Sequence, residues 1–120
     1  MRLLSFAILI TSLSIQTTWA DTVLTQAETF LNNKQIVQAY DLLAPLEDQR
    51  AGEPAYDYLY GMVLLEAGEP SRAAFAFERC LAAEPNNGPC RVQMARTHIA
   101  LGETTSSRKE LETLKEYNPP

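Results

Sequence analysis

The strongest constraint on the fold of this chain is a pattern of residues that recurs every 34 positions. In blocks that start at residues 20, 54 and 88, small residues recur at two fixed positions and large apolar residues recur at a third. The small residues are Ala27, Gly61 and Ala95, then Ala39, Ala73 and Ser107; the large ones are Leu43, Phe77 and Leu111. A unit that recurs at this period buries its apolar face only against neighbouring copies, so the spacing predicts a stack of repeats.

Within each block the apolar residues recur at helical spacing, as Leu59, Met62 and Leu65 do, which predicts two helices per block. We expect six helices, near residues 22–32, 36–49, 54–67, 71–84, 88–101 and 105–116. Pro45 removes a backbone hydrogen bond inside the second of these, so that helix should kink or end near Ala44.

This spacing and its residues resemble the tetratricopeptide repeat. The middle block matches the family at Gly61, Leu64, Gly68, Ala73, Phe77 and Pro85, and the third at Ala95, Gly102, Leu111 and Pro119. The first block lacks the turn glycine and the terminal proline, and the position that is often Trp holds Val23, Asp57 and Arg91. The resemblance covers residues 21–120. It implies an all-α fold, a right-handed α-solenoid of three helix-turn-helix units at about 20–53, 54–87 and 88–120.

The first 20 residues have the pattern of a secretory signal peptide. Met1 and Arg2 give a positive start, an apolar stretch runs from residue 3 to 15, and Thr18 and Ala20 are small residues before a cut after Ala20. The apolar stretch is shorter than the roughly 20 residues that cross a bilayer. We therefore expect export, cleavage after Ala20 and a periplasmic mature chain of residues 21–120.

Cys80 and Cys90 flank a short turn, EPNNGP, between two expected antiparallel helices. Residues at similar distances from such a turn face each other, and an oxidising compartment favours a disulfide between them. Two small, reduced core residues are the alternative. A redox-active pair is a remote third reading because the spacing is not that of a C-x-x-C motif.

Composition excludes several classes of function. The chain has 10 Lys and Arg against 15 Asp and Glu, which argues against nucleic-acid binding. Its one histidine, His98, has Arg91 and Arg108 near it at helical spacing and so no metal-ligand partner, and we expect it to be structural and not a metal ligand or a base. With no phosphate-binding loop and no paired carboxylates in an apolar context, we expect a non-enzyme without metal or cofactor.

The resemblance implies that the first helix of each unit lines a concave groove for a partner. The groove residues are then Leu24, Glu28, Leu31, Tyr58, Met62, Leu65, Val92, Arg96 and Ile99. Family members that clamp a peptide carboxylate use several basic groove residues, and this chain has only Arg96. A groove that is mainly apolar suits an amphipathic helix or an extended peptide better, although the protein's own packing could also close it.

The last expected helix should leave an inner face open, with Leu111, Leu114 and Tyr117 partly exposed. A partner, a second copy or a downstream domain should cover this C-terminal edge. Stretches such as DLLAPLE, DYLYGMVLLEAGEP and ARTHIALGE also resemble bacterial periplasmic repeat modules that precede outer-membrane β-barrels. The main hypothesis is thus an exported adaptor for another envelope protein. The alternatives are the front module of such a barrel protein and, remotely, a small redox protein.

Overall fold

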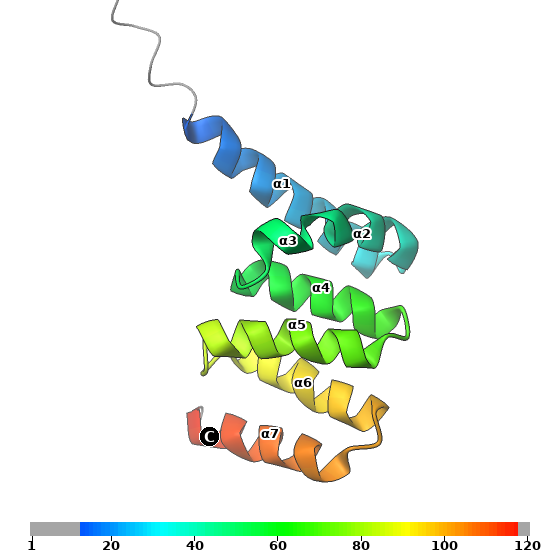
Figure 1. The fold of residues 1–120 in the computed structure, drawn as a ribbon, viewed down its shortest axis with the longest axis vertical. Helices are drawn as coiled ribbons and strands as arrows, with labels where there is room; N and C mark the ends of the chain where they lie inside the picture. The colour runs from blue at the N-terminus through cyan, green and yellow to red at the C-terminus, as the bar shows by residue number, and fades with distance from the viewer. Residues whose placement is uncertain (1–12, 118–120) are drawn as a thin grey trace, which may run out of the picture.

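The computed structural model describes residues 13–117, and throughout them the chain is helical apart from short turns (Figure 1). The helices are α1 (Leu13–Asn32), α2 (Ile36–Leu43), a 3-10 turn η1 (Ala44–Leu46), α3 (Glu47–Arg50), α4 (Pro54–Glu66), α5 (Pro70–Ala83), α6 (Gly88–Ala100) and α7 (Thr104–Tyr117). They stack as three antiparallel pairs: α1 with α2 to α3, α4 with α5, and α6 with α7. The fold is the predicted α-solenoid.

Helix α1 starts earlier than expected and runs through Ala20, the residue at the predicted cleavage site. Most of the predicted signal peptide lies outside the described residues, as does Pro119, so cleavage stays a prediction. Over the part of the chain that the structure describes, no helix is both long enough and apolar enough to cross a membrane.

The turn inside each helix pair has the same backbone geometry. The backbone N–H groups of Gln35, Glu69 and Glu103 donate to carbonyl oxygens five residues back, at 2.8, 2.9 and 2.7 Å. Such a bond closes the Schellman motif, which needs a left-handed residue beside it. Gly68 and Gly102 fill that place with φ of 79° and 77°, whereas the first pair uses a lysine, Lys34, at 61°. The first pair therefore repeats the geometry without the glycine.

Pro45 interrupts the second helix as predicted. In the 3-10 turn η1 the Glu47 N–H donates to the Ala44 carbonyl, and not to the Leu43 carbonyl as it would in a continuous α-helix. The buried Tyr56 hydroxyl, from α4, donates to the Leu43 carbonyl at 2.7 Å. The irregular helix is thus tied to the next pair.

One hydrophobic core runs through the stack, and its buried members come from both helices of the first two pairs and from α6. In its middle, Gly61 lets the Phe77 ring pack directly against the backbone of α4. Next to this core Cys80 and Cys90 form a disulfide between α5 and α6, with a Cα–Cα distance of 6.5 Å. Both cysteines are fully buried. Because α5 belongs to the second pair and α6 to the third, the disulfide links these two pairs covalently.

Candidate binding groove

The predicted groove residues lie on α1, α4 and α6, the first helices of the three pairs. Four of them are exposed, namely Glu28, Val92, Arg96 and Ile99, and four are half-buried, namely Leu24, Tyr58, Met62 and Leu65. Leu31 differs because it is only 6% exposed and packs into the core, where it offers little surface to a ligand. The remaining residues give the first helices a partly accessible apolar surface.

A pocket of about 360 Å³ lies between α1 and α4. Its lining residues are Leu24, Thr25, Glu28, Ala55, Tyr58 and Leu59. The structure thus brings together three predicted groove residues, Leu24, Glu28 and Tyr58. The helical pattern did not point to Thr25, Ala55 or Leu59, because the angle between two helices decides which neighbouring residues face the same hollow.

The two charged groove residues are in different electrostatic situations. Arg96 forms an ion pair with Glu66 at 3.5 Å and donates to the side-chain oxygen of Gln93 at 2.6 Å. Glu28 has no hydrogen bond or ion pair to any side chain that the structure describes. The groove therefore presents an uncompensated negative charge on α1, while its positive charge on α6 is already paired.

A second hollow, of about 510 Å³, lies where α2 approaches the turn between α4 and α5. It is lined by Ile36, Val37, Tyr40, Glu66, Ala67 and Glu69, none of which the sequence indicated. Its carboxylates already have partners, since Glu66 pairs with Arg96 and Glu69 pairs with Arg72 at 2.8 Å. Charge alone gives this hollow no preference for a ligand.

At the C-terminal edge, Leu111 and Tyr117 are exposed and Leu114 is half-buried. The Arg91 guanidinium lies 5.9 Å from the centre of the Tyr117 ring, a distance at which a cation and an aromatic face attract each other. An apolar strip of α7 thus faces solvent in the described chain.

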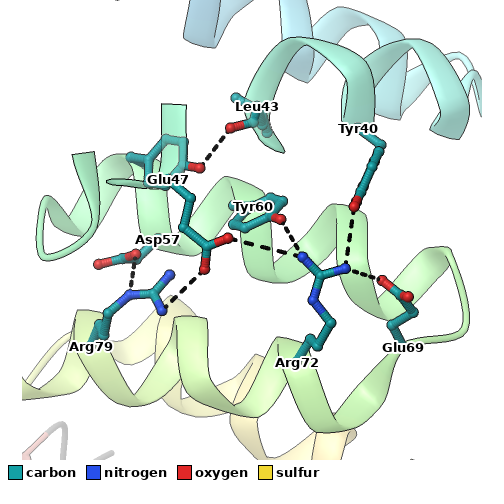
Figure 2. Close-up of polar contacts among 9 residues, drawn as sticks. Tyr40, Leu43, Glu47, Asp57, Tyr60, Glu69, Arg72 and Arg79 are labelled. Atoms are coloured by element: carbon teal, nitrogen blue, oxygen red, sulfur yellow. Dashed lines mark hydrogen bonds and ion pairs between the residues drawn. The ribbon is translucent and has the colours of Figure 1, made fainter. Parts of the chain in front are cut away.

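The sequence did not predict a polar network that joins the first and second pairs (Figure 2). Arg72 on α5 donates to the Tyr40 hydroxyl at 3.2 Å and to the Tyr60 hydroxyl at 2.8 Å, and it also pairs with Glu69. Glu47 on α3 lies 3.9 Å from Arg72 and 3.5 Å from Arg79. These bonds fix the irregular α2 to α3 segment against α5.

Asp57 is fully buried at the block position where the family often has Trp. Its carboxylate accepts from Arg79 Nε at 2.9 Å and from the Gly52 backbone N–H at 2.7 Å. Burial raises the pKa of Asp57 above its ordinary range, against these two hydrogen bonds, which lower it. The third pair has the opposite arrangement, with Arg91 at that position and Glu110 Oε2 at 2.6 Å.

The hydroxyls of Tyr56 and Tyr60 and the imidazole of His98 form hydrogen bonds within the chain. Burial is the main cause that raises the pKa of Tyr60 to about 12 and the pKa of Tyr56 higher still, so both phenols stay protonated as hydrogen-bonding groups. His98 Nδ1, on α6, lies 2.8 Å from Oε2 of Glu103, which is in the turn between α6 and α7. Among residues 13–117 no group of three or more His, Cys, Asp or Glu side chains could hold a metal ion.

The family comparison agrees with this architecture. A tetratricopeptide repeat model matches residues 64–120, from the end of α4 through α7. The match supports a tetratricopeptide repeat. It does not reach the first pair, whose turn geometry nevertheless repeats that of the other two. No curated protein and no solved structure is found to match the chain. Tetratricopeptide repeats generally mediate protein–protein interactions and are typically non-catalytic.

Proposed function

We propose that the chain is an exported, non-catalytic interaction module of the bacterial envelope, which binds another envelope protein or a peptide segment of one through its groove. The observation that carries this proposal is the pocket between α1 and α4, together with the apolar side chains that extend from it along α4 and α6. Half-buried Tyr58 and Met62 suit such a role because aromatic and methionine side chains adapt to apolar ligands.

Two features support the envelope location. The N-terminal sequence has the pattern of a signal peptide. The disulfide between Cys80 and Cys90 is compatible with an oxidising compartment such as the periplasm. Cell fractionation and N-terminal sequencing of the mature protein test this part of the proposal. A cytoplasmic chain that keeps Met1 would contradict it.

The binding role is tested by crosslinking the tagged protein in its native envelope and identifying what is captured. The groove variant Tyr58→Ala/Met62→Ala is the main comparison, and Phe75→Ala, an exposed apolar side chain on α5, is the matched control. We expect one reproducible partner that the groove variant loses and the control retains. A partner that both variants retain would move the interface away from the groove, and no specific partner would contradict the adaptor proposal.

The exposed strip of α7 is a second candidate interface, through which two copies could associate. Leu111→Glu/Leu114→Glu should then convert a dimer to a monomer, because each substitution places a charge in the apolar contact. Light scattering after size-exclusion chromatography measures the mass. A monomer in both proteins, or an unchanged oligomer in the variant, would rule out this edge.

A further inference from the structure

The pocket between α1 and α4 combines apolar and charged groups, and its role as a ligand site rests on the proposed function of the groove. Leu24, Ala55 and Leu59 form apolar parts of its lining, and Glu28 contributes one carboxylate. Neither that carboxylate nor the Tyr58 hydroxyl has a hydrogen-bond partner among the described residues. The pocket thus offers an unpaired negative charge and an aromatic ring beside apolar walls.

We infer that this pocket binds the side chain of an arginine or lysine that lies within an apolar segment of the partner. A long basic side chain can place its methylene stem along apolar walls and bring its charged head to Glu28. The Tyr58 ring adds an attraction for the same cation. Arginine should bind more tightly than lysine, because its planar guanidinium stacks on aromatic rings and forms paired hydrogen bonds with a carboxylate.

The charges elsewhere on the chain favour a cationic ligand over an anionic one. A peptide carboxylate would need free basic groups in the groove, but Arg96 is occupied by Glu66 and Gln93. The formal net charge of −5 also attracts a basic segment and repels an acidic one at long range. Long-range attraction depends on the net charge and not on one particular glutamate. Substituting Glu28 alone therefore distinguishes the contribution of the pocket to affinity from that of the net charge.

The test selects peptides from a phage-displayed random library on the purified, disulfide-bonded protein and then measures the affinity of acetylated synthetic copies. We expect selected peptides to combine apolar residues with at least one Arg or Lys. Glu28→Gln should weaken them about three- to fivefold, as the loss of one partly exposed ion pair does. Glu78→Gln, on α5, makes the same change in net charge at an exposed site outside the pocket and should leave affinity unchanged.

A second selection on Glu28→Lys sharpens the result, because it should enrich acidic residues where the unmodified protein enriches basic ones. The inference would be overturned if the selected peptides carried no basic residue, or if Glu28→Gln did not change their affinity. The groove function would still stand in either case, provided that Tyr58→Ala/Met62→Ala weakened their binding. If Glu78→Gln weakened binding as much as Glu28→Gln, general charge would be the cause and the pocket would be excluded. No selected peptide at all would overturn both proposals.

Discussion

The contact between Gly61 and Phe77 gives a quantitative test of the packing. Gly61 lies inside α4 and has no need of a glycine for its backbone, since its φ is not positive. A Cβ at this position would lie 2.6, 2.7 and 2.9 Å from three carbons of the Phe77 ring. Carbon atoms prefer about 3.5–4.0 Å. Gly61→Ala therefore requires the fully buried ring to shift by roughly 1 Å.

The expected cost follows from two opposed effects. Alanine is favoured over glycine in a helix interior by about 1 kcal/mol, whereas overpacking a core costs about 1–3 kcal/mol. Since the ring has no solvent-facing space to move into, we expect the upper part of that range and a net destabilisation of about 1–2 kcal/mol. For a domain of about 100 residues, each kcal/mol lowers Tm by about 4–8 °C.

The other two blocks show how to separate packing from propensity. They carry Ala27 with Leu43 and Ala95 with Leu111 at the same positions, so the chain itself pairs alanine with leucine. Phe77→Leu should be destabilising alone, but in that background Gly61→Ala should be neutral or stabilising. Urea denaturation followed by circular dichroism measures all four proteins as a double-mutant cycle. Equal effects of Gly61→Ala in both backgrounds, or stabilisation of the protein that keeps Phe77, would refute the reasoning.

Three further predictions concern the disulfide, the turns and Asp57. Cys80→Ala/Cys90→Ala should lower the free energy of unfolding by about 2–3 kcal/mol, because the short loop is no longer closed. A reductant should destabilise only the unmodified protein. Equal sensitivity of both proteins to reductant would contradict the buried disulfide. Lys34→Gly should stabilise by about 0.5–1 kcal/mol and Gly102→Ala should destabilise by about 1 kcal/mol, because a left-handed residue without Cβ is unstrained; thermal melts that change in the same direction would be inconsistent with this. Because the pKa of Asp57 is raised on folding, the folded protein binds its proton more tightly than the unfolded chain, and stability falls as pH rises from about the ordinary value of 3.8 through the raised pKa. Asp57→Asn should remove that part of the pH dependence in urea titrations, and an unchanged pH profile would show that Asp57 is not its source.

The period of the sequence was sufficient to predict the fold because it specifies which residues meet. A 34-residue recurrence of small and large apolar residues gave the helix positions closely, and Pro45 gave the break in the second helix. The turn of the first pair was not recognisable in the sequence, because its left-handed residue is Lys34. Glycine is the residue type that marks such a position, and lysine does not. Periodicity marks the face that is buried on average, and Leu31 shows its limit: a residue at a groove position lies in the core.

The contents of the groove were less predictable than its location. Glu28 and Arg96 look equivalent in the sequence, as single charges at corresponding positions of two blocks. Only the structure shows that Glu66, on the intervening α4, neutralises one of them, while no described side chain pairs with the other. The charge that a partner meets depends on contacts between neighbouring pairs, and such contacts are set by the angles at which helices cross.

The ion pairs at the position that is often Trp in the family add a constraint that apolar packing lacks. A large apolar side chain at this position could pack against any second helix of complementary shape, whereas a buried charged side chain needs a residue of opposite charge on that helix. In the second pair the first helix carries the acidic residue, Asp57, which pairs with Arg79. In the third pair the first helix carries the basic residue, Arg91, which pairs with Glu110. A stack that paired α4 with α7 in the same register would place Thr113, the residue 34 positions after Arg79, beside Asp57, and the buried carboxylate would lose its ion pair. In a different pairing each of these charged residues would lose its partner, because Ala76 stands 34 residues before Glu110 and Thr113 stands 34 residues after Arg79. The two ion pairs therefore favour α5 as the partner of α4 and α7 as the partner of α6, a choice that the shared 34-residue pattern alone leaves open.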